Sequence, residues 1–393
     1  MILLDEGSLS GIITSVIRTL LLSFLLAAFP AAARTVSLIE IDGPIGPVAA
    51  EYVVDALTRA RKASEPLAVL RLDTPGGLDR SMRRIVRAVV TSDVPVVAWV
   101  GPSGARAASA GLFVVAAAHV AAMAPGTNLG AAHPVSIGGK GMDETLAKKA
   151  EEDAAAYIRA LAQQRGRDPA WFEGAVVESE SLSAEEALEK GVIDLISGNL
   201  TGVLEAVDGR EVSLVDRKTV LRTEGLVAVP VPMSLRQRAL RVLADPNIAY
   251  LLLLLGFYGL FFELSNPGSI FPGVLGGLCL ILAFVGLQTL PFNYGGVLLI
   301  LLGLLLLLLE VKITSFGLLT VGGVVSLTLG SLMLFRTAEA FQRLSVGVIL
   351  PAVGATVAFF VFAVGKGLAA QRTRRVSGRE GLVGEKGRAL EPL

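Results

Sequence analysis

The chain has 393 residues, of which 53% are hydrophobic and 18% are charged. Its 35 basic and 35 acidic residues cancel, so the charge gives no indication of a nucleic-acid partner. A single cysteine, Cys279, excludes an intrachain disulfide and a CxxC metal site, and two histidines without an HExxH motif argue against a zinc protease. The mean hydropathy of +0.65 is too high for an ordinary soluble protein, and the apolar excess lies in residues 248–366. We therefore expect a soluble part followed by a membrane part.

The N-terminal segment 1–34 has the order of features found in a secretory signal. Arg18 precedes an apolar stretch over 20–29, and small residues follow at 31–33. Cleavage after the small residues would export the domain that follows, and an uncleaved anchor helix is the alternative. Both interpretations place residues 35–230 outside the cytoplasm.

Residues 35–230 alternate short apolar strands with helices. The expected strands are TVSLIEI, PLAVLRLD, VPVVAWV and HVAAMAP, and helices are expected over GPVAAEYVVDALTRARKA, LDRSMRRIVRAVVTS and SAGLFVVAAA. This alternation predicts βαβ units and a mostly parallel sheet, in which ligands bind beyond the carboxyl ends of the strands. Two of those ends carry glycine-rich turns, DTPGG at 73–77 and GPSG at 101–104.

Two further helices complete the soluble part. MDETLAKKAEEDAAAYIRALAQQRG predicts a helix of about six turns that ends at Gly166. Its expected buried stripe is Leu146, Ala150, Ala154, Tyr157 and Leu161. LSAEEALEKGVIDLI opens with a capping box from Ser183 to Glu186, stops at Gly191 and continues into a short strand.

A basic linker, 231–247, leads to the membrane part at 248–366. Its five expected spans, each long enough for a hydrocarbon core of about 30 Å, are 248–264, 269–288, 294–313, 316–335 and 345–365. The first two, separated by SNPGSIFPG, could instead form one hairpin. Five spans put the C-terminal tail, 367–393, in the cytoplasm, where its basic residues follow the positive-inside rule.

One short segment, ARAASAG at 105–111, combines a hydroxyl with unusually small neighbours. Ser109 is expected to follow a strand and a turn and to begin a helix, so the N–H of Ala110 would point outward with the helix dipole behind it. Gly76 or Gly77 would allow the neighbouring strand end to bring in a second N–H. A nucleophile beside two such amides could attack a carbonyl. A helix cap at Ser109 and an ordinary tight turn at DTPGG are the alternatives.

Two residues could accept the proton of this serine. Lys149 is expected at the border of the buried stripe, where removal from water favours the neutral form of a lysine, whereas Lys148 should face solvent. Asp153, one turn further, would stabilise the charged form of Lys149. His133, 24 positions after Ser109, is the other possible base. Periodicity does not choose between them.

Several motifs occur in one order along the chain: LDTPGG, ARAASAG, MAPGTNLGAAHPV, KAEEDAAAYIRALAQQRGR, SAEEALEKGVID and FFELSNPGSIFPGVLGG. In these motifs the chain resembles the NfeD family of membrane-bound serine proteases of the ClpP class, in their long form. The resemblance implies an α/β ClpP/crotonase-like domain followed by an α-helical multi-pass membrane domain. It implies a serine endopeptidase with a Ser–Lys dyad, in which Ser109 is the nucleophile, Lys149 the base, and the amides of Gly77 and Ala110 the oxyanion hole. No metal or other cofactor is implied.

The resemblance also implies partners and leaves alternatives open. It predicts a homodimer or higher homo-oligomer in the lipid membrane, with hydrophobic segments of stomatin-like membrane proteins as substrates or partners. His133 occupies about the place of the ClpP triad histidine, so a Ser–His mechanism stays open. A crotonase-like site for an acyl thioester and a non-catalytic scaffold for stomatin-like partners are the other hypotheses. Longer family members carry an OB-type barrel after the membrane, of which 367–393 would be a remnant that cannot close a barrel.

Overall fold

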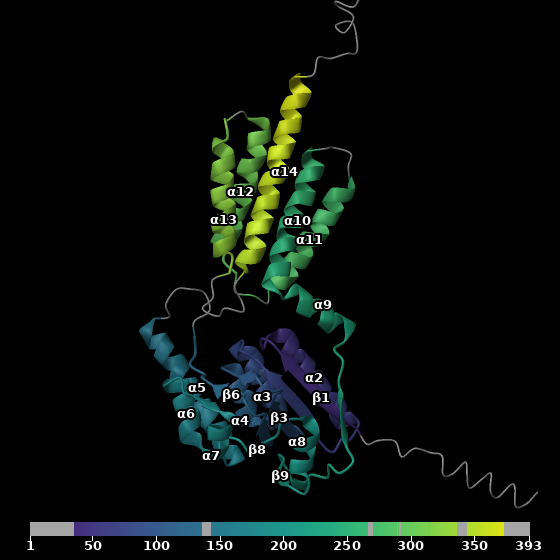
Figure 1. Cartoon of the computed structure of the whole chain (residues 1–393), viewed down its shortest axis with the longest axis vertical. Coiled ribbons are helices and arrows are strands. Elements are labelled where there is room, and N and C mark those ends of the chain that lie inside the picture. The colour runs from purple at the N-terminus through teal and green to yellow at the C-terminus, as the bar shows by residue number, and fades with distance from the viewer. Residues whose placement is uncertain are drawn as a thin grey trace, which may run out of the picture. The chain divides into compact units, whose positions relative to one another are not determined.

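The structure is a computed structural model that describes residues 35–135, 143–265, 270–288, 290, 292–313, 315–335 and 344–372 (Figure 1). The predicted signal or anchor segment and most of the predicted tail lie outside the described residues. Contacts divide the chain into two compact units. The first holds the residues up to Pro134 together with Lys148–Met233, and the second holds 135–147 together with the residues from Ser234 onward.

The first unit is an α/β domain built on a six-stranded sheet. The strands, in the order in which they pair, are β11 (Val227–Pro230), β1 (Thr35–Asp42), β2 (Ala68–Asp73), β3 (Val96–Val100), β5 (Val120–Met123) and β8 (Leu195–Ile196). Every neighbouring pair is parallel. The four strands predicted from the alternation and the predicted parallel sheet are therefore confirmed, and β11 adds an edge strand that was not predicted.

Seven helices in the described residues surround this sheet (Figure 1). They are α2 (Pro47–Lys62), α3 (Asp79–Val90), α4 (Ala110–Ala117), α5 (Glu144–Arg165), α6 (Pro169–Val177), α7 (Ala184–Glu189) and α8 (Leu200–Val207). Sequence periodicity explains α3, whose residues Met82, Ile85, Val86 and Val89 are buried at helical spacing. The capping box predicted for α7 is present, because the side chains of Ser183 and Glu186 each accept from the other's backbone N–H.

Besides β11, five shorter strands were not predicted. They are β4 (Arg106–Ala107), β6 (Asn128–Gly130), β7 (Ser181–Ser183), β9 (Glu211–Ser213) and β10 (Lys218–Val220). The first three form a second small sheet in the order β4-β6-β7, and β9 and β10 form an antiparallel pair. Strands of two or three residues are too short for an alternating pattern to be recognised.

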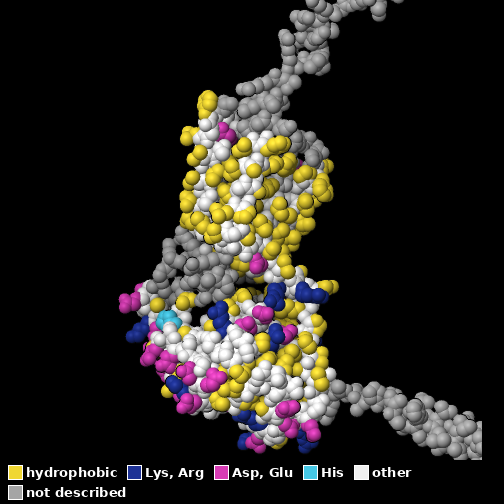
Figure 2. Space-filling view, in the orientation of Figure 1, with side chains coloured by type: hydrophobic (Ala, Val, Ile, Leu, Met, Phe, Trp, Pro, Cys, Tyr) yellow, Lys and Arg dark blue, Asp and Glu magenta, His cyan; other side chains and the backbone are white. Residues whose placement is uncertain are grey.

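The second unit is helical. Its helices are α9 (Leu235–Leu243), α10 (Pro246–Ser265), α11 (Ile270–Leu287), α12 (Tyr294–Lys312), α13 (Leu318–Met333) and α14 (Val346–Arg372). Among the described residues, the stretches Pro246–Leu264 and Ile270–Leu287 are long and apolar enough to cross a membrane, and α12, α13 and α14 contribute shorter apolar stretches. Hydrophobic side chains cover the visible surface of these helices (Figure 2).

Two features of this unit were not predicted. The segment predicted as a basic linker contains a helix, α9, which begins at a capping box formed by Ser234 and Gln237. The last helix, α14, extends to Arg372, beyond residue 366, where the membrane part is predicted to end.

Glycines let the membrane helices pack closely in pairs. A Cβ added at Gly259 would lie 2.4 Å from the carbonyl oxygen of Pro272, and one added at Gly276 would lie 2.7 Å from that of Gly256. Close backbone approach of this kind is typical of helix pairs in membranes. Helices α10 and α11 therefore pack closely against each other, which fits two separate spans as well as one hairpin. Gly303 allows the same close approach between α12 and α13. A Cβ added there would lie 2.7 Å from the backbone nitrogen of Leu327.

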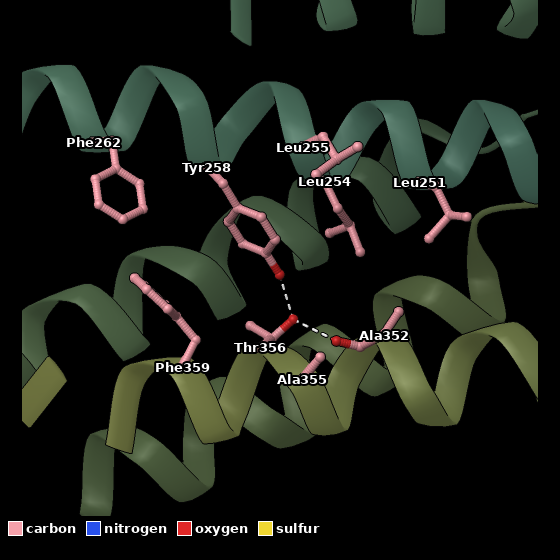
Figure 3. Close-up of a pocket in the computed structure, with 9 residues that line it drawn as sticks. All are labelled: Leu251, Leu254, Leu255, Tyr258, Phe262, Ala352, Ala355, Thr356 and Phe359. Carbon is pink, nitrogen blue, oxygen red and sulfur yellow. Dashed lines mark hydrogen bonds between the residues drawn. The ribbon is translucent and has the colours of Figure 1, made fainter. Parts of the chain in front are cut away.

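An apolar groove with a cavity volume of about 310 Å³ lies between α10 and α14 (Figure 3). Its lining residues are Leu251, Leu254, Leu255, Tyr258, Phe262, Ala352, Ala355, Thr356 and Phe359. The hydroxyls of Tyr258 and Thr356 are hydrogen-bonded to each other, and Thr356 Oγ1 donates to the carbonyl oxygen of Ala352 at 2.6 Å. The residues that line the groove include no carboxylate, histidine or lysine that could act in hydrolysis.

Candidate active site

The DTPGG turn after β2 and the segment that contains Ser109 are backbone neighbours. After β2, Thr74 N donates to the carbonyl oxygen of Arg106 at 2.7 Å, and Ala108 N donates to that of Thr74 at 3.1 Å. These bonds hold the DTPGG turn parallel to β4, through a bridge between Thr74 and Ala107. The turn therefore lies directly beside the segment that leads into Ser109.

Ser109 is the N-cap of α4 and has a strained backbone, with φ +50° and ψ −116°. Its N–H donates to the carbonyl oxygen of Ala131 at 2.7 Å, and its own carbonyl accepts from Leu112 N at 3.0 Å. Both backbone groups are thus fixed, while the half-buried hydroxyl has no hydrogen-bond partner among the described residues. Strain of about 1–3 kcal/mol at one residue persists only where its surroundings enforce it, and such strain concentrates at functional sites. A serine on a sharp strand-to-helix turn is also the geometry of a nucleophile elbow.

Two backbone N–H groups beside Ser109 have no acceptor among the described residues. In the turn, Gly76 N is bonded to Thr74 Oγ1 at 3.1 Å and Leu78 N to the Ile45 carbonyl at 3.0 Å, which leaves the N–H of Gly77 unpaired. At the start of α4, Gly111 N and Leu112 N have acceptors in the preceding turn, which leaves the N–H of Ala110 unpaired. Two free amide donors near one hydroxyl can stabilise a negatively charged oxygen.

Glycine is required at both turn positions. Gly76 has φ +122°, and a Cβ added there would lie 2.6 Å from Ser109 Cβ and 3.0 Å from Ser109 Oγ. A Cβ added at Gly77 would lie 2.2 Å from the carbonyl oxygen of Ile45. The absence of a side chain at Gly76 keeps the serine hydroxyl uncovered, and its absence at Gly77 lets the turn pack against the backbone of Ile45. A tight turn without a role at Ser109 would not need to lie so close to the serine side chain.

Lys149 lies on the first turns of α5, and its side chain is exposed, as is that of Lys148. The expected buried stripe is correct at Ala154 and Leu161 but wrong at Leu146, which is 54% exposed. The first turns of the helix extend beyond the core, so helical spacing alone misplaced the buried face there. No hydrogen bond or ion pair joins Lys149 to another described residue.

Asp153 does not form the ion pair with Lys149 that the sequence suggested. Its carboxylate instead forms an ion pair with Arg83 of α3. Arg83 also pairs with Asp79 at 3.0 Å and lies over the ring of Tyr157, 4.6 Å from its centroid. Although partial burial opposes the charge, the two carboxylates raise the pKa of Arg83 above its usual value. The carboxylate of Asp153 is therefore paired with Arg83 and not with Lys149.

His133 follows the segment that accepts the Ser109 N–H, but its ring points elsewhere. Nδ1 lies 3.0 Å from the carbonyl oxygen of Val176 and 3.9 Å from a carboxylate oxygen of Glu151. Because a carbonyl only accepts, Nδ1 carries the proton and Nε2 remains as an acceptor in the neutral ring. Neither His133 nor Lys149 is hydrogen-bonded to Ser109 in this structure. The structure thus brings together the serine and the two amides but not the base.

The described residues contain no group of three or more His, Cys, Asp or Glu side chains placed to hold a metal ion. The reactive groups of the site are the hydroxyl and the two amides described above.

Each of the two units matches a known protein family. The family described as NfeD1b, N-terminal domain, matches residues 35–225, and the NfeD integral membrane domain matches residues 247–366. The two matches follow one another and together span nearly all of the described chain. The chain belongs to the NfeD family. Its fold class, an α/β ClpP/crotonase-like domain followed by a helical membrane domain, is as predicted.

Two curated relatives match this NfeD chain. It is 31% identical over 270 residues to the membrane-bound protease PH1510 of Pyrococcus horikoshii, covering 67% of the chain and 61% of the relative. It is 29% identical over 250 residues to the membrane protein NfeD1b of Bacillus subtilis, covering 63% of the chain and 55% of the relative. The match thus spans less than two thirds of the length of either relative.

A solved structure also matches. It is that of the 1510-N membrane-bound stomatin-specific protease, as a lysine-to-alanine mutant in complex with a substrate peptide. The identity is 28% and the TM-score 0.49, with 53% of this chain and 96% of that chain covered.

Sequence reasoning missed how this NfeD domain anchors the far end of α4. Arg167 donates from Nη1 to the carbonyls of Val115 and Ala116 at 3.0 and 3.1 Å, and from Nη2 to Asp194 at 2.8 Å. Arg165 donates from Nε to the carbonyl of Ala117 at 2.8 Å. Burial lowers the pKa of both guanidinium groups, that of Arg165 to about 10. The two arginines satisfy the C-terminal carbonyls of the buried helix whose N-terminus carries Ser109.

The only sequence signal for this anchor is the pair of arginines in RGRDP at 165–169. A basic pair after a long helix is usually solvated, so the pattern alone does not reveal it. Thr74 was missed for a similar reason. Its buried hydroxyl fixes the DTPGG turn by bonding Gly76 N, and a threonine between an aspartate and a proline gives no indication of this role.

Proposed function

We propose that the α/β unit is a membrane-anchored serine endopeptidase with Ser109 as nucleophile and Lys149 as base. The observation that carries the proposal is the combination of a strained serine at a strand-to-helix turn with two unpaired amides, that of Ala110 next to it and that of Gly77 in the neighbouring turn. The match to a relative named as a membrane-bound protease supports it. A serine that served only as a helix cap would accept a hydrogen bond from an N–H of the first turn of α4, and Ser109 makes no such bond.

In the proposed reaction, Ser109 Oγ attacks the carbonyl carbon of the scissile peptide bond and gives its proton to Nζ of Lys149. The carbonyl oxygen becomes negatively charged and accepts hydrogen bonds from the N–H groups of Gly77 and Ala110, which would lower the barrier. When the C–N bond breaks, Lys149 returns the proton to the leaving amine and an acyl-enzyme remains. Water then attacks the ester, with Lys149 again taking a proton and returning it to Ser109.

The base has to approach the serine for this reaction to occur. An ammonium group cannot accept a proton, so Lys149 acts only in its neutral form, which removal from water favours. We infer that a bound peptide, lying over Ser109, brings Lys149 out of solvent and within reach of the hydroxyl. Catalytic contacts that are absent without substrate often form when it binds.

The proposed substrates are apolar peptide segments, as in the hydrophobic parts of stomatin-like membrane proteins. The residues next to Ser109 are small, and of these Ala108 is half-buried whereas Ala107, Ala110 and Gly111 are buried. Short side chains at these positions leave the hydroxyl accessible, and the methyl group of Ala108 favours contact with apolar side chains. The proposal includes the predicted location, with the protease unit outside the cytoplasm, and homo-oligomers in the membrane.

The test is hydrolysis of quenched fluorescent peptides rich in leucine, valine and alanine by the full chain in detergent. We expect Ser109→Ala and Lys149→Met to reduce the rate to background. Lys148→Met is the matched control, because it removes the neighbouring exposed lysine, and should retain full activity. Full activity of Ser109→Ala would refute the proposal. Loss of activity in His133→Gln but not in Lys149→Met would replace the Ser–Lys dyad by a Ser–His mechanism.

A further inference from the structure

The apolar groove between α10 and α14 follows one face of each helix. Its lining side chains recur every three or four residues, from Leu251 to Phe262 on α10 and from Ala352 to Phe359 on α14. Figure 3 shows Leu251, Tyr258 and Phe262 pointing from α10 toward α14. At 1.5 Å per residue, the α10 side of the groove is about 16 Å long. The groove is therefore elongated along the two helices.

The two helices are joined at both ends of the groove. Where they begin, Ser345 N donates to the side-chain oxygen of Asn247 at 3.0 Å, so α10 and α14 start at the same level. At the other end, the rings of Phe262 and Phe359 bridge the helices, with their centroids 5.5 Å apart. The groove thus runs inward from the start of the helices and ends at an aromatic pair.

The polar atoms of the lining are already used within the protein. Thr356 Oγ1 donates to the carbonyl oxygen of Ala352, so the hydrogen of the bond between Tyr258 and Thr356 comes from Tyr258. All other lining residues are leucine, phenylalanine or alanine. The described lining side chains thus offer no free hydrogen-bond donor, and a ligand in the groove gains affinity from apolar contact. The occupant that fits this surface is a hydrocarbon.

A transmembrane helix of a partner fits the groove poorly. Where helices of this chain pack closely, glycines such as Gly276 and Gly303 let the backbones approach each other. The described residues that line the groove include no glycine, and leucines such as Leu255, which is 55% exposed, stand at its edge. A helix of about 10 Å diameter does not enter a space that the hydroxyl bond and the aromatic pair cross. A single hydrocarbon chain is thinner.

The length and position of the groove match one acyl chain of a bilayer leaflet. The NfeD integral membrane domain, at residues 247–366, includes both helices of the groove. A hydrocarbon core of about 30 Å gives each leaflet about 15 Å, close to the length of the groove. Leu251, at the open end, lies one turn after Asn247, where α10 begins. A chain that follows the groove therefore has its headgroup near the starts of α10 and α14.

We propose that this groove binds one acyl chain of a membrane phospholipid. The chain enters beside Leu251 and ends with its methyl group against Phe262 and Phe359. Bound there, it contacts α10, which packs on α11, and α14, which packs on α12 and α13, and so fills the space between these two sets of helices. The inference does not depend on protease activity.

The test uses the full chain in phosphatidylcholine nanodiscs that contain a small fraction of phosphatidylcholine with a diazirine near the methyl end of one acyl chain. After irradiation, fragment-ion mass spectrometry locates the adducts. Leu254 and Thr356 are 3% and 2% exposed, so a lipid reaches them only from inside the groove. Ala358, an exposed residue of α14 outside the lining, reports contact with bulk lipid.

Ala355→Leu is the variant that fills the groove. Ala355 lines the groove and is exposed, so the added methyl groups displace no packed side chain. Ala358→Leu is the matched control, because it makes the same change outside the groove.

We expect adducts on Leu254 or Thr356 in the unmodified chain. Their yield should fall at least about fivefold in Ala355→Leu and stay within about twofold in Ala358→Leu. Adducts confined to exposed residues, or a yield that Ala355→Leu leaves unchanged, would overturn the proposal. A disulfide-linked dimer of an Ala355→Cys chain that also carries Cys279→Ala, with no adducts on the two buried residues, would assign the groove to a second copy and would equally overturn it.

Discussion

Replacing Gly76 by alanine tests the active-site geometry most sharply, because the added Cβ meets the nucleophile itself. That Cβ would lie 2.6 Å from Ser109 Cβ and 3.0 Å from Oγ. Carbon atoms in contact prefer a separation of about 3.5–4.0 Å, so the turn has to shift by roughly 1 Å. Such a shift would displace the adjacent N–H of Gly77. A misplacement of that size can cost about 100-fold in rate, and loss of one oxyanion donor costs about 100- to 1000-fold.

Gly104→Ala is the matched control. Gly104 also has a positive φ, +88°, but an added Cβ there has nothing within 4 Å. Both variants therefore carry the strain of a non-glycine residue at positive φ, about 1–2 kcal/mol, whereas only Gly76→Ala adds overpacking of about 1–3 kcal/mol. We expect Gly104→Ala to keep activity within about threefold of the unmodified chain.

The assay is peptide hydrolysis at a temperature where both variants are folded, as established by thermal unfolding monitored by circular dichroism. Gly76→Ala should unfold at a lower temperature than Gly104→Ala and should lose at least about 100-fold in hydrolysis rate. A folded Gly76→Ala variant with activity close to that of Gly104→Ala would refute the account, since it would show that the hydroxyl of Ser109 does not need the bare turn.

Three further predictions concern stability. Burial, with smaller contributions from Arg165 and Arg167, lowers the pKa of His119 to about 3, so the unfolded chain binds a proton that the folded chain does not over the range from about 6.5 down to 3. Stability of the α/β unit should therefore fall by up to about 1.4 kcal/mol per pH unit below about 6.5, measured by urea unfolding, and His119→Gln should flatten this slope. Arg167→Met should destabilise the unit by about 3–5 kcal/mol, because it leaves Asp194 and two α4 carbonyls without their buried partner. An unchanged midpoint of urea unfolding would contradict the role of Arg167 as an anchor of α4. Gly276→Ala should lower the thermal stability of the chain in detergent more than Gly277→Ala, since an added Cβ meets the backbone 2.7 Å away at the first position and nothing at the second; equal shifts would argue against close α10–α11 packing.

The sequence was sufficient for the parts of the fold that have strong periodicity. The long apolar stretches predicted α10 to α14, and the alternation of apolar strands and helices predicted the parallel sheet. The sequence also predicted which chain segments form the candidate site. Glycine-rich turns after buried strands and a serine among small residues differ clearly from the sequence around them.

The contacts that connect those segments could not be predicted. The bridge from Thr74 to Ala107 uses a two-residue strand, β4, and no pattern indicates which turn such a strand pairs with. The burial of the α5 stripe depends on where the core ends, which helical spacing does not contain, so Leu146 was misplaced. Helix α9 was not predicted, because its arginines were interpreted as part of a basic linker. The sequence does not choose between Lys149 and His133 as the base, because helical spacing does not contain the position of either side chain relative to Ser109.

The most direct test of the central claim, that Ser109 is the nucleophile, is to locate a covalent adduct. The full chain is treated with a fluorophosphonate, digested with trypsin and analysed by fragment-ion mass spectrometry. Cleavage after Arg106 gives a peptide that contains both Ser109 and Ser136, so fragment ions are needed to separate the two. We predict one adduct, on Ser109, that is absent when the chain is unfolded before treatment. No adduct on the folded chain, or an adduct on any other serine, would contradict the account.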